Sequence, residues 1–232
     1  YRIFEEVGGA REVLLDDTGK SMVLAKLVQK HKKELPYLGS QMNKAGYLDE
    51  VKSLISEFMQ YDVKEEEMEE MLEKAGEESL LYRKMKDVKL LYTSFKEYLE
   101  GHYITGEGVM DALRAAIPFS AKMKNSVVLL DGYTGFTPIQ LHVIRELLIV
   151  CDRILVTVTM DARENPTDMG KPHQLFYMSK KMIHSLTELT HDLEDPVLLK
   201  KREKGRFAGS PALGFLEQHL FRYKKAVYEK QQ

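Results

Sequence analysis

The residues best suited to chemistry lie together in a short loop that follows Ser126 and the apolar run at 127–130. Asp131 and Gly132 end the run, and two aromatic residues, Tyr133 and Phe136, lie within the next four positions. A single carboxylate at the end of a buried strand can hold Mg²⁺ beside a nucleotide. Any buried strand can also end in aspartate at a turn, so a nucleotide-side role and a structural role both stay open for Asp131.

Gly132 bears on whether a nucleotide held beside Asp131 could be hydrolysed. P-loop NTPases that hydrolyse a nucleotide usually carry a glutamate directly after the Mg²⁺-side aspartate, where it polarises the attacking water. Gly132 offers no carboxylate at this position. Even with a nucleotide beside Asp131, we therefore expect hydrolysis to be handicapped.

The aromatic residues Tyr133 and Phe136, and also Tyr1, have two possible roles. Exposed rings at a strand end can stack on nucleic-acid bases, an interaction worth about 1–3 kcal/mol per base. Alternatively, the rings fill the gap between a sheet and its helix, which is the commoner role of such side chains. The residue types alone leave both roles open.

The triplet Gly19-Lys20-Ser21 looks like the end of a phosphate-binding loop but does not complete one. That loop requires a glycine five residues before Gly19, and Leu14 occupies the position. The triplet also lies inside a helical pattern, with no strand expected ahead of it. We therefore expect no nucleotide site here.

The other ionisable residues complete no catalytic or metal site in the sequence. The seven histidines lack the spacing of metal ligands, and no nucleophile elbow, pair of catalytic carboxylates or glycine-rich dinucleotide loop is present. The basic residues at 200–206 could meet phosphates, although such a run is more often a solvated loop. The glutamates at 65–70 are most simply the wet face of a helix.

The elements around Asp131 have the pattern of a strand–helix–strand unit. Residues 127–130 and 154–160 are near-continuous apolar runs, which are typical of parallel strands buried on both faces. Thr137 as the N-cap and Pro138 at the first helical position start the helix between them. Such a crossover is right-handed, and ligands of open α/β sheets sit outside the carboxyl ends of the strands, where Asp131 lies.

Most of the remaining chain predicts helices. Apolar spacing of three and four residues indicates helices at about 16–35, 47–61, 64–75, 78–101, 105–116, 174–193 and from 211 onward. Asp16 or Asp17 can cap the first of them. No strand is expected before residue 124. The fold class we expect is therefore α/β with a large all-helical part in the first half of the chain.

Composition excludes several classes of protein. The net charge of −2 means that any nucleic-acid surface must be local. The single cysteine, Cys151, excludes a disulfide framework and fits a reducing, cytoplasmic setting. No apolar run approaches the roughly 20 residues of a membrane span. Since the 232 residues begin without methionine, we expect them to be a segment of a longer protein.

The order and spacing of these motifs resemble those of the AddB (RexB) family. Residues 1–20, which begin YRIFEEVGGA, look like the segment after the first DNA-contacting strand of that family. The sequence DGYTGFTP at 131–138 looks like its degenerate Walker B segment, and ILVTVTM at 154–160 looks like the strand that follows. AddB is the second subunit of the ATP-dependent helicase/nuclease AddAB, the Gram-positive counterpart of RecBCD.

The resemblance implies an architecture and a set of roles. Residues 1–10 and 124–232 would belong to a RecA-like, P-loop NTPase-type α/β domain, and residues 11–123 would form its all-helical insertion. It implies that Asp131 is the Mg²⁺-side aspartate and that Gly132 marks the lost glutamate. It also places aromatic DNA contacts near Tyr1 and near one of the two loop residues, Tyr133 or Phe136.

The resemblance further implies a function and partners. We expect a segment that contacts single-stranded DNA during the processing of double-strand-break ends, with an AddA-like helicase–nuclease subunit as partner and no membrane. Mg²⁺ and ATP would be bound only in the parent protein, and this segment alone would neither hydrolyse ATP nor cut DNA. The alternative is a helical protein-interaction module without DNA binding of its own.

Overall fold

The computed structural model describes residues 2–8, 12–44, 46–161, 163–199, 206–220 and 225–229. The chain divides into two compact units, Tyr1–Thr157 and Val158–Gln232, which are described separately below. Within the described ranges, no helix is both long and apolar enough to cross a membrane.

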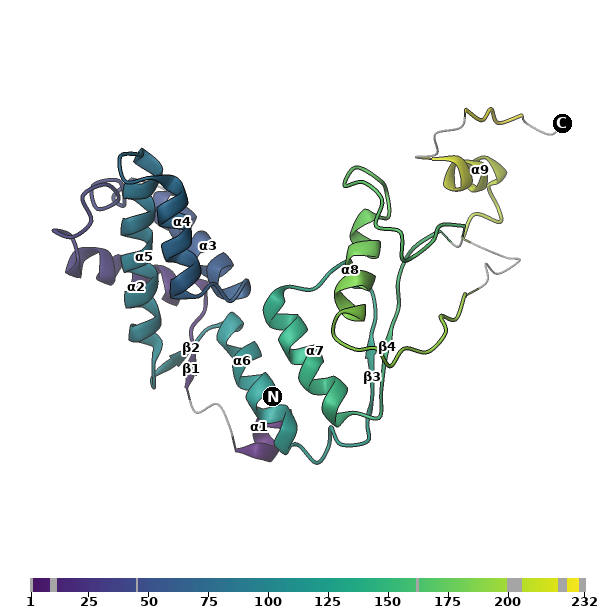
Figure 1. The fold of residues 1–232 in the computed structure, drawn as a ribbon, viewed down its shortest axis with the longest axis horizontal. Helices are drawn as coiled ribbons and strands as arrows, with labels where there is room; N and C mark the ends of the chain where they lie inside the picture. Colours follow the sequence, from purple (N-terminus) through teal and green to yellow (C-terminus); the bar gives the residue numbers. More distant parts are fainter. Residues whose placement is uncertain are drawn as a thin grey trace. The chain divides into compact units, whose positions relative to one another are not determined.

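The first part of Tyr1–Thr157 is helical, as the apolar spacing predicts (Figure 1). The helices are α1 (Arg2–Val7), α2 (Asp17–Lys30), α3 (Tyr47–Gln60), α4 (Glu65–Ala75), α5 (Leu80–Leu99) and α6 (Gly106–Ala116). Side-chain caps begin α2, α5 and α6: the backbone N–H groups of Gly19, Tyr82 and Gly108 donate to the side-chain oxygens of Asp16, Ser79 and Thr105 at 2.7, 2.9 and 3.2 Å, respectively. Each cap satisfies a backbone donor that the first helical turn leaves free.

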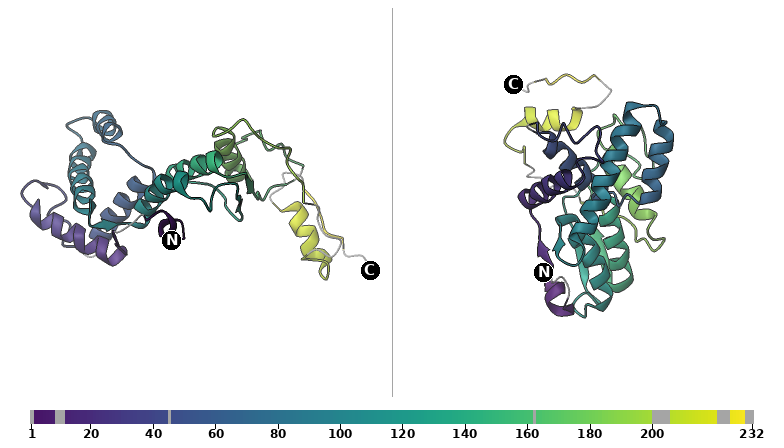
Figure 2. Two further views of the ribbon diagram at one scale, coloured as in Figure 1. Left: turned by 90° about the horizontal axis from the view of Figure 1, so that it is seen from below. Right: turned by 90° about the vertical axis from the view of Figure 1, so that its left-hand side faces the viewer.

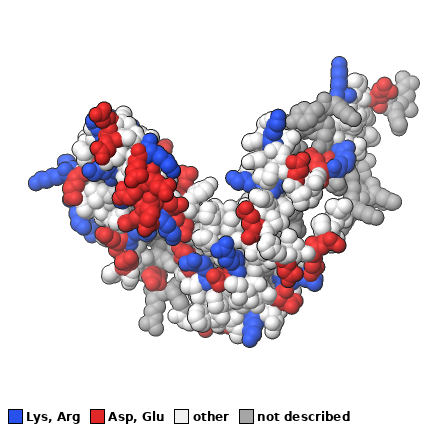
Figure 3. All heavy atoms as spheres, viewed as in Figure 1, with Lys and Arg blue, Asp and Glu red and all other residues white. Residues whose placement is uncertain are grey.

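Helices α2 to α5 enclose the larger apolar core. Its most buried side chains include Leu24, Leu91 and Phe95, each at most 2% exposed. The outer face of α4 is acidic, and Figure 3 shows the carboxylates gathered over this helix. The exposed glutamates of α4 are Glu65, Glu66, Glu67, Glu69, Glu70 and Glu73. The expectation of a wet, charged helix face is confirmed.

Two short strands in the helical part were missed. β1 (Val13–Leu14) pairs in parallel with β2 (Tyr103–Ile104), so the expectation of no strand before residue 124 is wrong. Strands of two residues are too short for an alternating apolar pattern to mark them. Their pairing depends on tertiary packing that brings distant parts of the chain together.

The strand–helix–strand unit is confirmed. β3 (Val127–Leu130) pairs in parallel with β4 (Arg153–Val156), and α7 (Pro138–Val150) connects them. Thr137 is the N-cap of α7, and its backbone N–H donates to the Gln140 side chain at 2.9 Å. A short 3₁₀ helix, η1 (Ile117–Phe119), precedes the unit.

A second apolar core lies between this unit and α6. Ile117 is fully buried, and Val143 and Leu147 of α7 are at most 8% exposed. Met110 and Leu113 of α6 pack against them, and α6 lies alongside α7 (Figure 2). Thus α6, which falls within the predicted insertion at 11–123, shares a core with the strands.

The expectation of strands buried on both faces is wrong. Val127, Leu129 and Leu155 are 58%, 61% and 45% exposed, whereas Val128 and Ile154 pack into the core beside α7. Because α7 covers one face of the sheet, alternate side chains of each strand are left exposed. β4 also ends at Val156, earlier than the apolar run to residue 160 predicts.

The second unit, Val158–Gln232, contains α8 (Tyr177–Thr187) and α9 (Pro211–His219). α8 is shorter than the helix expected at 174–193. Lys180 of α8 is 5% exposed, and its ammonium lies 2.9 Å from the Glu164 carboxylate. This ion pair ties α8 to the loop that precedes it.

A mostly helical chain with small parallel sheets is compatible with the predicted α/β class. The RecA-like fold and the division into 1–10, 11–123 and 124–232 stay predictions.

Candidate nucleic-acid interface

The loop at 131–136 starts where β3 and β4 end together. Thr157 directly follows β4, and its backbone N–H donates to the Leu130 carbonyl at 3.0 Å. This bond continues the parallel ladder by one residue. The side chain of Thr157 therefore lies beside Asp131, the first residue of the loop.

The Thr157 hydroxyl joins the two strand ends. It donates a hydrogen bond to the carboxylate of Asp131. It also accepts one, at 3.3 Å, from the backbone N–H of Gly132. Asp131 is otherwise exposed to solvent. One hydroxyl group is thus hydrogen-bonded both to the Asp131 carboxylate and to the Gly132 N–H.

Asp131 is the one carboxylate at the start of this loop, and one of its oxygens accepts the Thr157 hydrogen bond. Mg²⁺ is usually held by one or two carboxylates together with phosphates and water, so Asp131 could supply at most one ligand and does not make a metal site by itself. In the part of the chain that the structure describes, no three His, Cys, Asp or Glu residues gather as metal ligands. We derive no nucleotide step from this site, and Mg²⁺ and ATP binding in a parent protein stays a prediction.

Gly132 has a conformational reason to be glycine. Its φ is +78°, in the left-handed region that residues with a Cβ rarely adopt. A Cβ built there would meet no atom within 4 Å, so the constraint is the backbone angle rather than space. Absence of the glutamate was evident from the sequence, but this backbone angle was not.

The structure brings Tyr133 and Phe136 together. Their ring centroids are 5.0 Å apart with the planes inclined by 32°. Tyr133 is 44% exposed, and Phe136 is half-buried behind it. The ring of Tyr133 is therefore partly accessible, and both roles predicted for these aromatic residues, contact with DNA and packing between the sheet and its helix, stay predictions. Tyr1 lies outside the described residues.

Thr157 is the residue of this site that the sequence reasoning missed. The apolar run was expected to continue as a strand to residue 160, which hid the end of β4 at Val156. A hydroxyl residue at the end of the strand that neighbours Asp131 was the available signal.

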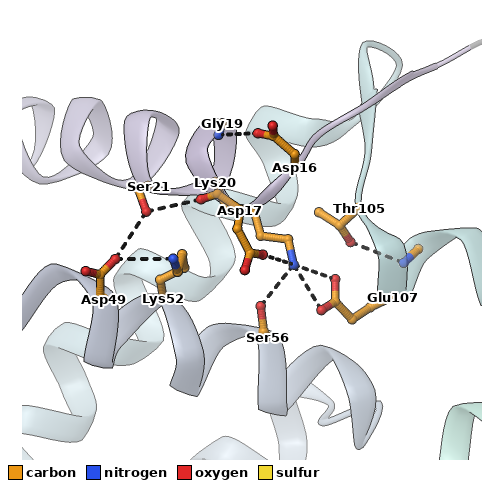
Figure 4. Close-up of polar contacts among 11 residues, drawn as sticks. Asp16, Asp17, Gly19, Lys20, Ser21, Asp49, Lys52, Ser56, Thr105 and Glu107 are labelled. Atoms are coloured by element: carbon orange, nitrogen blue, oxygen red, sulfur yellow. Dashed lines mark hydrogen bonds and ion pairs between the residues drawn. The ribbon is translucent and has the colours of Figure 1, made fainter.

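The triplet at 19–21 lies inside a helix, as expected, and its lysine is engaged within the fold (Figure 4). The Lys20 ammonium is 3.0 Å from both carboxylate oxygens of Glu107 and 3.2 Å from the Ser56 hydroxyl. Asp17 lies 3.6 Å away. Lys20 is 6% exposed, so its charge faces these partners rather than a ligand.

Glu107 is held in its ionised form. Burial raises the pKa of Glu107, but hydrogen bonds from its own backbone N–H, from Lys20 and from Thr105, together with the Lys20 charge, outweigh burial and lower the pKa below 4.5. The Lys20–Glu107 ion pair connects α2 to α6, and the hydrogen bond from Lys20 to Ser56 connects α2 to α3. The cluster is a structural site between helices.

Comparison with known proteins gives a consistent result. A family model described as ADDB, N-terminal, matches residues 1–217. The chain is 36% identical to the B-type subunit of the ATP-dependent helicase/deoxyribonuclease of Lachnoclostridium phytofermentans, covering 100% of this chain and 21% of that protein. The proteins of the same name from Caldanaerobacter subterraneus subsp. tengcongensis and Bacillus licheniformis are 32% and 28% identical, over 99% and 96% of this chain. The chain spans about one fifth of the length of these relatives.

We expect Gly132→Ala to lower the free energy of unfolding by about 1–2 kcal/mol, because the new Cβ is strained at a left-handed φ. Gly106→Ala is the matched control, since Gly106 has equally open surroundings at the start of α6 and no left-handed φ. Urea unfolding of both variants measures the difference. Equal losses in the two variants would contradict the role given to the backbone angle.

We expect Glu107→Gln to destabilise the chain by about 3 kcal/mol at pH 7, because it leaves the buried Lys20 ammonium without its charged partner. The pKa of Glu107 is lowered by folding, so its stabilisation is full above the ordinary value of 4.5 and is lost as the pH falls through the folded pKa. The unfolding free energies of the parent and Glu107→Gln should therefore converge as the pH falls below the pKa of Glu107 in the folded chain.

The control for this pH series is Glu57→Gln, at an exposed position of α3. Denaturant unfolding at several pH values between 3 and 8 provides the comparison. A gap between the parent and Glu107→Gln that stays constant over this range would show that the ion pair is not the source of the stabilisation.

Proposed function

The chain belongs to the family of AddB N-terminal regions, and from this premise we propose that it contacts single-stranded DNA during the processing of double-strand-break ends. The contact we propose is the loop at 131–136. The observation that carries the proposal is the exposed ring of Tyr133, packed against Phe136 at the shared carboxyl ends of β3 and β4.

The geometry favours binding over chemistry. Aromatic rings at the edge of a sheet provide a surface on which bases of any sequence can stack. Asp131 is hydrogen-bonded to Thr157, and Gly132 carries no side chain to activate a water. Nucleotide hydrolysis and DNA cleavage, which the names of the relatives suggest, are therefore proposed for the longer protein and not for this loop.

The acidic side chains of this unit limit where DNA can bind. The carboxylate of Asp131 opposes the approach of phosphates, so stacking rather than ion pairing must supply most of the affinity at the loop. The acidic face of α4 repels DNA more strongly (Figure 3). A strand bound to this chain would thus avoid α4, with its bases turned toward Tyr133.

We extend the proposal to the assembly. The relatives are named as one subunit of a helicase/deoxyribonuclease, so we propose an AddA-like helicase–nuclease subunit as the partner and DNA ends as the ligand of the assembled protein. Mg²⁺ and ATP would be bound outside this chain, and the setting would be the cytoplasm.

A second candidate function is a protein-interaction module without DNA binding. The acidic outer face of α4 supports this alternative, because a dense row of carboxylates suits a basic protein surface better than a polyanion. In this case the helical core of α2 to α5 would be the part that docks.

We expect the chain to bind fluorescein-labelled oligo-dT with an affinity that changes little as salt rises, because stacking at the loop neutralises few phosphates. Tyr133→Ala and Phe136→Ala should each weaken binding by about tenfold through lost stacking, without changing the salt dependence. Tyr61→Ala, which removes a 55% exposed ring at the end of α3, is the matched control and should bind normally. Fluorescence anisotropy at low and moderate salt measures all four proteins.

Two results would count against the proposal. Absence of oligo-dT binding at low salt, with binding to a purified AddA-like protein retained, would favour the interaction module. Turnover of ATP by the purified chain would contradict the interpretation of Gly132 as the mark of a lost catalytic residue.

A further inference from the structure

We propose that Thr157 is the positioning residue of the loop at 131–136, holding it in the conformation that presents Tyr133 and Phe136. The inference rests on the proposed function for its consequence in DNA binding. The positioning itself is a property of the folded chain and can be measured without DNA.

The hydrogen bonds of Thr157 carry the argument. Its backbone N–H donates to the Leu130 carbonyl at 3.0 Å, its hydroxyl donates to the Asp131 carboxylate, and the same oxygen accepts from the Gly132 N–H at 3.3 Å. Three consecutive residues at the end of β3 are thus fixed to one residue at the end of β4. In the described ranges, these are the hydrogen bonds that connect the start of the loop to the fold.

The loop needs such an anchor because of Gly132. Glycine has the widest choice of backbone conformations, and here it adopts the left-handed one with open space around it. An added Cβ would meet no atom within 4 Å, so the bond to its N–H is the contact that favours this conformation. The Thr157 hydroxyl supplies that bond and leads the chain toward Tyr133.

This arrangement gives Asp131 a role in the folded chain. Its carboxylate holds the Thr157 hydroxyl in the orientation in which the oxygen lone pairs face the Gly132 N–H. The carboxylate and the hydroxyl therefore act as a pair. Removing either one should release the loop, and removing both should release it no further.

The cost of losing the pair should appear in binding more than in stability. Asp131 is exposed, so water replaces the lost hydrogen bond and the free energy of unfolding changes little. A loop that visits several conformations binds with an affinity reduced by the fraction of time spent in the competent one. We expect Thr157→Val to weaken oligo-dT binding about three- to tenfold.

The chain contains no tryptophan, which allows a single fluorescent reporter. Phe136→Trp places one indole in the loop, and its anisotropy and quenching by acrylamide report how firmly the loop is held. Thr157→Val, Thr157→Ser and Asp131→Ala are then compared in this background without DNA. Thr93→Val is the matched control. It removes a hydroxyl of α5 that lies 3.4 Å from the carboxylate of Glu65 on α4.

We expect Thr157→Val to lower the anisotropy of the introduced indole and to increase its quenching, while Thr157→Ser retains the parent values because it keeps the hydroxyl. Asp131→Ala should loosen the loop as Thr157→Val does, and the double variant should be no looser than either. Thr93→Val should leave the indole unchanged.

If the anisotropy and the quenching of the indole are the same with Thr157 and with Thr157→Val, the positioning role is overturned, whatever the DNA affinities. A loop that loosens as expected, in proteins that retain the unfolding midpoint of the parent, supports the role. If oligo-dT then binds neither to the parent chain nor to Thr157→Val with Phe136 in place, that result contradicts the proposed function and not the assignment of Thr157.

Discussion

The parallel pairing of β3 with β4 is the constraint on which the candidate interface depends. Parallel strands that are linked by a helix end at the same edge of the sheet, so the pairing places Asp131 against Thr157. α7 stabilises the pairing from one face, where Ile117, Val143 and Leu147 are buried. The aromatic loop therefore starts from a fixed point, although the sheet beneath it has two strands in the described part of the chain.

Polar contacts join the two apolar cores of Tyr1–Thr157. Lys20 of α2 pairs with Glu107 of α6, and the His142 imidazole of α7 lies 3.7 Å from the Asp62 carboxylate in the turn between α3 and α4. A buried ion pair adds little net stability, but a packing that left Lys20 unpaired would be costly. These contacts therefore restrict how the helical part packs on the strand–helix–strand unit.

Local signals in the sequence predicted the helices well. Thr137, and Asp16 or its neighbour Asp17, were predicted as caps because capping is a property of a few adjacent residues, and the structure selects Asp16. The two-residue strands, the end of β4 at Val156 and the exposed sheet face were not predicted, since each depends on which distant segment packs nearby. The same limit applies to the interface: Asp131 and the aromatic residues stand out by type, whereas Thr157 gains its role only from strand pairing.

The central claim is that single-stranded DNA contacts the loop at the carboxyl ends of β3 and β4. Photocrosslinking of an oligo-dT that contains 5-iodouracil, followed by mass spectrometry of the digested chain, tests it most directly. The account predicts that the crosslinked base lies on Tyr133 or Phe136. Crosslinks confined to the helices α2 to α5, with none in the loop at 131–136, would contradict it.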